Sequence, residues 1–127
     1  MNRAYVLPMT TVSATGAQTA RDVSAVSGDG ALVLHIQSLV PSESLSIGEG
    51  VRIVLEESTN SFEAAYPVAV IDLATPIPAT GPDMVVTWRH YQIPLTLAGS
   101  SGALMRVNIV KFPVNPTTLQ LEAYFEY

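Results

Sequence analysis

The sequence contains no cysteine. This absence excludes disulfides, thiolate catalysis and zinc sites with cysteine ligands, and it leaves the redox compartment open. Charged residues are also scarce, at 13% of the chain against 48% hydrophobic residues. Few charges are therefore available to cover a solvated surface, and we expect part of the apolar surface to contact another protein.

Basic residues are especially few. Lysine and arginine together number 6 against 11 aspartates and glutamates, which gives a formal net charge of -5. Binding to phosphates needs clustered lysines and arginines, and the basic residues of this chain are scattered. We therefore expect no direct contact with nucleic acid.

Long apolar runs are missing as well. No run approaches the roughly 18 residues that a membrane span requires. The segment Ala4–Met9 is too short to be the apolar region of a secretory signal, and Pro8 interrupts it. We expect a soluble chain that is made in the cytoplasm and has no membrane partner.

Catalytic and cofactor motifs are not found. His35 and His90, the only histidines, belong to no metal-binding spacing, and each falls in a strand-like run where a surface position explains it. No glycine-flanked nucleophilic serine and no phosphate-binding glycine loop is present. The sequence predicts a protein that is not an enzyme, with no catalytic, metal-binding or cofactor-binding residues and no cofactor.

Glu56 and Glu57 are neighbours in the chain, so in a strand they point to opposite faces and cannot act as a carboxylate pair. If Glu57 shares the face of Val51, Ile53 and Leu55, it needs a partner such as an arginine, because an unpaired buried carboxylate is costly.

What the sequence does contain is alternation at a period of two, which is typical of half-buried strands. The end of the chain, residues 118–127, shows it most clearly. The predicted core faces of four strands comprise Leu32, Leu34 and Ile36; Val51, Ile53 and Leu55; Met105, Val107 and Ile109; and Leu119, Leu121, Ala123, Phe125 and Tyr127. Residues 66–73 and 84–91 are apolar and β-branched enough for two more strands, and 20–25 is a weaker candidate.

Turn-forming segments rich in glycine, proline, serine and asparagine separate these runs, and no helical pattern is convincing. Parallel strands would need intervening helices. The sequence therefore predicts an all-β fold, an antiparallel β-sandwich of jelly-roll type with about six to eight strands.

Residues 1–19 differ from the rest, because Met9–Thr19 is small, polar and uncharged. We interpret residues 1–19 as an extended N-terminal arm and residues 20–127 as the sandwich domain. A frayed terminus explains the same composition equally well. Within the arm, Arg3, Tyr5, Val6 and Leu7 are candidates for anchoring it to a partner.

Trp88 is the only tryptophan, and it is followed by Arg89, His90 and Tyr91. An exposed tryptophan beside polar groups is a usual platform for a sugar ring. Because its segment opens with apolar residues from Met84, we favour a place in the core or at a subunit interface.

One segment carries a family resemblance. The run from Val51 to Phe62 ends in Glu56-x-Ser58-x-Asn60-x-Phe62, and it follows the strand-like residues 31–39 across a loop. Residues 20–127 resemble the small cement or decoration proteins of tailed bacteriophage capsids, most closely the Bbp16-like group, which carries a similar element. This chain departs from the family in having Thr59-Asn60-Ser61 where members have Thr-Asp-Asn, and in its proline-rich segment 75–82.

The resemblance implies a jelly-roll sandwich on the outer capsid surface of the virion, made in the host cytoplasm. It would bind the major capsid protein and stabilise contacts between capsid subunits, usually as a symmetric homo-oligomer, for which we favour a trimer over a dimer. The residues expected at the partner or oligomer interface are Arg3, Tyr5, Val6, Leu7, Pro76, Pro78, Trp88, Tyr124 and Tyr127. The alternative is a carbohydrate- or receptor-binding module of a phage tail or another assembly, in which Trp88 would be exposed in a groove.

Overall fold

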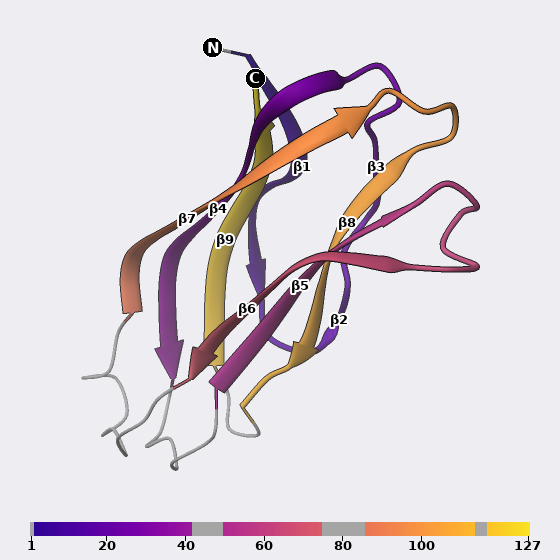
Figure 1. Ribbon diagram of the computed structural model, residues 1–127. Helices are drawn as coiled ribbons and strands as arrows, with labels where there is room; N and C mark the ends of the chain where they lie inside the picture. The colour runs from indigo at the N-terminus through magenta and orange to yellow at the C-terminus, as the bar shows by residue number, and fades with distance from the viewer. Residues whose placement is uncertain (1, 42–49, 75–85, 114–116) are drawn as a thin grey trace.

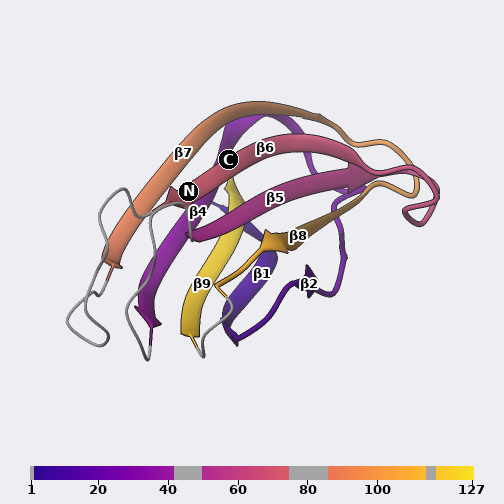
Figure 2. The ribbon, with the colours of Figure 1, turned by 90° about the horizontal axis from the view of Figure 1, so that it is seen from below.

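The computed structural model describes residues 2–41, 50–74, 86–113 and 117–127. Throughout these ranges the regular structure is antiparallel strand, and no helix occurs that could cross a membrane. The strands form two sheets that face each other (Figures 1 and 2). The all-β antiparallel sandwich predicted from the sequence is thus confirmed.

The first sheet has the strand order β1-β9-β4-β7, and the second has the order β2-β8-β5-β6, with β3 also paired to β8. The chain changes sheet at every connection except β2–β3 and β5–β6, and this strand order is that of a jelly roll. The first sheet contains β1 (Arg3–Val12), β4 (Ser27–Pro41), β7 (Val86–Ala98) and β9 (Thr117–Glu126). The second contains β2 (Gly16–Ala17), β3 (Arg21–Asp22), β5 (Gly50–Ser58), β6 (Tyr66–Ala74) and β8 (Leu104–Lys111).

The described residues therefore hold nine strands, slightly more than the six to eight expected. Two of these strands were not predicted: β1, which was taken for an arm, and β2, which has two residues. The weaker candidate 20–25 does contain a strand, β3, also of two residues. Strands this short show no alternation.

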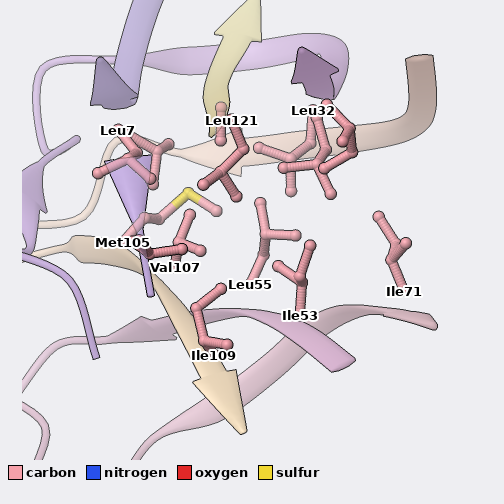
Figure 3. Packing of buried hydrophobic residues seen from close by; sticks show 14 of the residues in the cluster. Leu7, Leu32, Ile53, Leu55, Ile71, Met105, Val107, Ile109 and Leu121 are labelled. Carbon is pink, nitrogen blue, oxygen red and sulfur yellow. The ribbon is translucent and has the colours of Figure 1, made fainter. Parts of the chain in front are cut away.

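The core lies between the sheets, and Figure 3 shows both layers contributing to it. Leu7, Leu32 and Leu121 come from the first sheet and meet Ile53, Leu55, Ile71, Met105, Val107 and Ile109 from the second. The predicted inward faces of β4, β5 and β8 are buried, as are Leu119, Leu121, Ala123 and Phe125 of β9. Tyr127, predicted on the same face, follows the end of β9 and is exposed, so that prediction is wrong. Full burial of one large aliphatic side chain contributes roughly 1.5–3 kcal/mol, so this alternation is the main source of stability.

The N-terminal residues differ from the expectation of a separate arm. Strand β1 pairs with β9 from Arg3 opposite Glu126 to Val12 opposite Leu119. Val6 and Leu7 are 0% and 5% exposed, so they belong to the core. Register shifts between Tyr5 and Leu7 and between Leu7 and Thr10 break the period of two, which explains why the alternation is hard to see in this segment.

The two chain ends lie side by side (Figure 1). The backbone N–H of Asn2 donates to the carbonyl of Tyr127 at 2.8 Å, and the N–H of Tyr127 donates to the carbonyl of Asn2 at 3.0 Å. These bonds extend the β1–β9 ladder to the end of the chain. Residues 2–12 are therefore part of the sandwich, and the expected boundary at residue 19 does not separate packed from unpacked chain.

Candidate interaction surface

Two aromatic residues and an arginine form a patch on the outer face of the first sheet, at the β1–β9 pair. We call Arg3, Tyr5, Tyr124 and Glu126 the β1–β9 patch. Tyr5 is the cross-strand partner of Tyr124, and their ring centroids are 5.4 Å apart. The Arg3 guanidinium lies 4.3 Å from the centroid of the Tyr124 ring, and Arg3 Nε lies 3.5 Å from Glu126 Oε2.

The patch has a buried floor and an exposed rim. Tyr124 is buried, and this burial raises the pKa of its phenol above the usual 10.0. Tyr5 is 40% exposed, and the side chain of Arg3 is 48% exposed. A hydrogen bond with Tyr5 raises the pKa of Arg3, with smaller contributions from the charges of Tyr124, Tyr5 and Glu126, so the guanidinium stays charged. The patch therefore presents a positioned cation and an aromatic ring to solvent.

The structure brings only some of the predicted interface residues to the surface. Arg3 and Tyr5 lie in the patch, and Tyr127 is exposed with its ring stacked on Phe125, at 5.7 Å between centroids. Val6, Leu7 and Tyr124 are buried within the single chain, so they support the surface from below instead of contacting a partner. The expectation for these three residues is corrected accordingly.

The remaining predicted interface residues fall outside what the structure describes. Pro76 and Pro78 lie in the segment 75–85, which is not among the described residues. Trp88 lies in β7, but its side chain is likewise outside the description. The choice between an interface tryptophan and a sugar platform therefore stays a prediction from sequence.

The motif Glu56-x-Ser58-x-Asn60-x-Phe62 forms a hydrogen-bonded turn between β5 and β6. The hydroxyl of Ser58 accepts the backbone N–H groups of Asn60 (3.2 Å) and Phe62 (3.0 Å), and it donates to Asn60 Oδ1 (2.7 Å). Asn60 Oδ1 also accepts the N–H of Ala64 at 3.1 Å. These bonds hold Ser61 and Phe62 at φ of 56° and 62°, a left-handed conformation that costs about 1 kcal/mol per residue.

The strained turn places the Phe62 ring over an arginine of the neighbouring strand. The Arg106 guanidinium lies 3.9 Å from the Phe62 ring centroid, and its Nε donates to Glu56 Oε1 at 2.8 Å. Asn108 donates to the same oxygen at 3.3 Å. Every named residue of the motif thus has a structural partner, and we call Glu56, Phe62 and Arg106 the Arg106 cluster.

The carboxylate that meets an arginine is therefore Glu56, on the outer face, and not Glu57. Glu57 does lie opposite Met105, on the face that carries the core residues, but it sits where the sandwich opens, and its side chain is exposed. Water solvates it there, so the cost of an unpaired buried carboxylate does not arise. The partner role of Arg106 was not foreseen, because it is 50 residues from Glu56 in the chain.

The two histidines are cross-strand partners on the first sheet. The rings of His35 and His90 are stacked at 5.3 Å between centroids, and His35 Nδ1 lies 3.2 Å from Glu122 Oε1. The sequence had treated them separately, and only strand pairing reveals that they are neighbours. Across the described ranges, no group of three or more histidine, aspartate or glutamate side chains is placed to hold a metal ion.

A pocket of about 330 Å³ opens where the β5–β6 turn approaches the β7–β8 turn, at the same end of the sandwich in Figures 1 and 2. It combines one carboxylate, several hydroxyls and an apolar wall. Its lining residues are Val23, Glu57, Ser58, Thr59, Tyr66, Thr96, Leu97, Ala98, Gly99, Ser100, Ala103 and Leu104. The sequence patterns did not indicate this pocket, since its walls come from both sheets.

Comparison with known proteins gives a weak likeness in structure. No family model and no curated protein matches the chain. Among solved structures it is similar to the Drosophila NLP core, a structure reported for its insight into pentamer formation and histone binding. The identity is 15%, the alignment covers 98% of each chain, and the TM-score is 0.32. At this TM-score the likeness carries no argument about function.

Proposed function

We propose that this chain is a capsid cement protein, a structural virion protein that binds the outside of a bacteriophage capsid. Its partner is the major capsid protein, and its role is to stabilise contacts between neighbouring capsid subunits. The proposal starts from the resemblance of residues 20–127 to such proteins, above all in the segment Val51–Phe62. Two physical properties also support it: the rigidity of the sandwich and the exposed arginine and tyrosine of the β1–β9 patch.

A rigid body suits this role, because a clamp that deforms transmits little force between the subunits it joins. Both sheets close on one apolar core, and the terminal strands are hydrogen-bonded to each other up to Asn2 and Tyr127. The β5–β6 turn is held by the hydrogen bonds of Ser58 and Asn60 instead of being left loose. These features support a passive, load-bearing protein.

The observation that carries the proposal is the β1–β9 patch. Arginine and tyrosine are enriched at the centres of protein interfaces. Arg3 is already held by Tyr124 and Glu126, so less side-chain entropy remains to be lost when a partner binds. We propose that the exposed rim of the patch, Arg3 and Tyr5, contacts the capsid. Trp88 and the segment 75–82 remain further proposed contacts on sequence grounds.

Self-association belongs to the same proposal. A symmetric oligomer presents several copies of a weak site at once, and the combined occupancy far exceeds that of one site. We favour a trimer over a dimer, with Tyr127 as an exposed aromatic contact. Sedimentation equilibrium of the purified protein tests the copy number, and a monomer at all concentrations would refute the oligomer.

The capsid role is tested by incubating the protein with undecorated capsids and sedimenting them. We expect the protein to co-sediment at a fixed ratio to capsid subunits, and folded protein that stays in the supernatant would refute the proposal. The double variant Arg3→Ala and Tyr5→Ala should reduce bound protein at least about fivefold, as truncating interface anchors does. Val110→Ala is the matched control, because Val110 is similarly exposed but lies on the second sheet.

A further inference from the structure

The pocket at the β5–β6 end contains an acidic residue and an aromatic ring on one face. Glu57 and Tyr66 are directly opposed across β5 and β6. Opposed residues of antiparallel strands point to the same face, with their Cβ atoms about 5 Å apart. Both side chains line the pocket, and Tyr66 is 60% exposed. Glu57 and Tyr66 therefore form a solvent-exposed part of the pocket rim.

The carboxylate of Glu57 is not neutralised within the described chain, where the ion pairs formed by arginine are Arg3 with Glu126, Arg52 with Asp72 and Arg106 with Glu56. With a net charge of -5, the protein holds few cations of its own to place there. The negatively charged Glu57 therefore faces the solvent at the pocket rim. It favours a positively charged ligand over a neutral or anionic one.

Part of the pocket lining is apolar. Val23 and Leu97 are nearly fully buried, and with Ala103 and Leu104 they line the pocket behind its polar rim. Such a wall suits the methylene stem of a long side chain whose charged head stays near water. The volume of about 330 Å³ is at the lower end for ligand sites and fits one side chain better than a large molecule.

We propose that this pocket receives a single arginine side chain from a partner protein. The stem lies along Val23, Leu97 and Ala103, and the guanidinium donates to Glu57 and stacks on the Tyr66 ring. A guanidinium is favoured over an ammonium group because it is planar, binds carboxylates through two N–H groups and stacks on aromatic rings. The inference rests on the proposed capsid function only for the identity of the protein that carries the arginine.

The first experiment uses the isolated protein and the peptide acetyl-Gly-Arg-Gly-amide, followed by amide chemical shifts. We expect saturable shifts at the backbone of Thr59, Gly99 and Ser100. The matched control peptide carries citrulline, which keeps the shape of arginine without the charge, and it should bind at least about fivefold more weakly. Equal binding of the two peptides, or no shifts at the pocket, overturns the inference.

Variants locate the site. Glu57→Gln keeps the size of the side chain and removes its charge, so it should lower the affinity for the arginine peptide by about fivefold or more, and Tyr66→Leu by about threefold. Glu63→Gln, on the same turn but outside the pocket lining, should leave it unchanged. All three positions are accessible to solvent, and circular dichroism verifies folding. Unchanged affinity in folded Glu57→Gln overturns the inference.

The peptide assay and the capsid assay together separate this inference from the capsid proposal. If wild-type protein binds the arginine peptide at the pocket but never co-sediments with capsids, the capsid function fails and the arginine site stands. If the protein co-sediments with capsids but does not distinguish arginine from citrulline, the arginine site fails and the capsid function stands. When both hold, Glu57→Gln should lower capsid binding as well.

Discussion

Arg106 and Arg3 each lie between a carboxylate and an aromatic ring, on opposite sheets of the sandwich. Arg106 is 2.8 Å from Glu56 and 3.9 Å from the Phe62 ring centroid, and the ion-pair side chains are only 23% and 13% exposed. Arg3 is 3.5 Å from Glu126 and 4.3 Å from the Tyr124 ring centroid, with 48% of its side chain exposed. The chemical parts are alike, but their burial differs.

The difference in burial separates a contact that stabilises the fold from one that can take part in binding a partner protein. In the Arg106 cluster water is largely excluded, so the charges interact more strongly. Loss of either partner leaves the other as an unpaired, largely buried charge. In the β1–β9 patch water screens the pair, and the arginine can be shared with a partner protein at small cost. We therefore expect the same substitution to act on folding in one cluster and on binding in the other.

The largest effect is expected from Arg106→Met, which keeps an unbranched stem but removes the guanidinium group and its charge. Glu56 would retain only its contact with Asn108, and the protein should lose about 2 kcal/mol of unfolding free energy. Urea titration followed by fluorescence measures the loss. The control is Arg52→Met, whose ion pair with Asp72 is 49% exposed on both sides and should change stability much less. Equal losses in the two variants would contradict the assigned role of Arg106.

Ser58→Ala should follow, because it removes the acceptor for two backbone N–H groups of the β5–β6 turn. We expect a loss of about 1.5 kcal/mol of unfolding free energy and a Phe62 ring that no longer stays over Arg106. Denaturant titration gives the loss of unfolding free energy, and the ring-current shift at the Arg106 side chain gives the ring position.

Ser61→Gly is the control with the opposite expected effect. It keeps the hydrogen bonds of Ser58 and relieves a positive φ, so it should raise the unfolding free energy by about 0.5 kcal/mol. A ring position unaffected by Ser58→Ala would refute the interpretation of the motif as a device for placing Phe62.

Arg3→Met should reduce the free energy of unfolding much less than Arg106→Met does, because its ion pair is more exposed and longer. The measurement is the same urea titration used for Arg106→Met, so the two values compare directly. Loss of as much stability as in Arg106→Met would show that burial does not distinguish the clusters.

The smallest effect concerns acid stability at the exposed Arg52–Asp72 pair. The hydrogen bond from Arg52 lowers the pKa of Asp72 below its usual 3.8 in the folded protein. The unfolded chain therefore binds this proton more tightly, so the pair adds stability above pH 3.8 and loses it as the pH falls through the lowered pKa. Asp72→Asn should reduce the difference between urea midpoints measured well above and well below pH 3.8. Asp22, whose pKa is lowered mainly by hydrogen bonds from Ser24, is intact in both proteins and supplies the common background. An unchanged acid response in Asp72→Asn would contradict the assignment.

The sequence was most informative where one face of a strand is apolar without interruption. The alternation from Leu119 to Phe125 correctly predicted which side chains of β9 enter the core. It was least informative in β1, where bulges on either side of Leu7 and the polar residues Thr10 and Thr11 conceal the strand. For the same reason Val6 was taken for a partner contact, although it is fully buried.

The candidate sites could be predicted in part. Of the partner contacts predicted in β1, Arg3 and Tyr5 lie on the surface, and their contact with a partner stays a prediction. The pairing of His35 with His90, and of Glu56 with Arg106, could not be derived from the sequence. Each of these contacts joins residues of different strands, and the register between strands is set by packing of the whole core. The pocket behind Glu57 likewise needs both sheets to be in place.

By itself the sequence determined the class of fold and the direction of most side chains, because a period of two leaves an apolar strand only one way to face a core. The local sequence also determines the turn at Ser58 and Asn60, since its hydrogen bonds join residues at most four positions apart. Only the tertiary structure decided which arginine is buried with its carboxylate and which stays exposed. That outcome depends on strand register and strand order. They place Arg106 beside Glu56 and Asn108 and under the Phe62 ring, whereas Arg3 lies on β1 at the edge of its sheet.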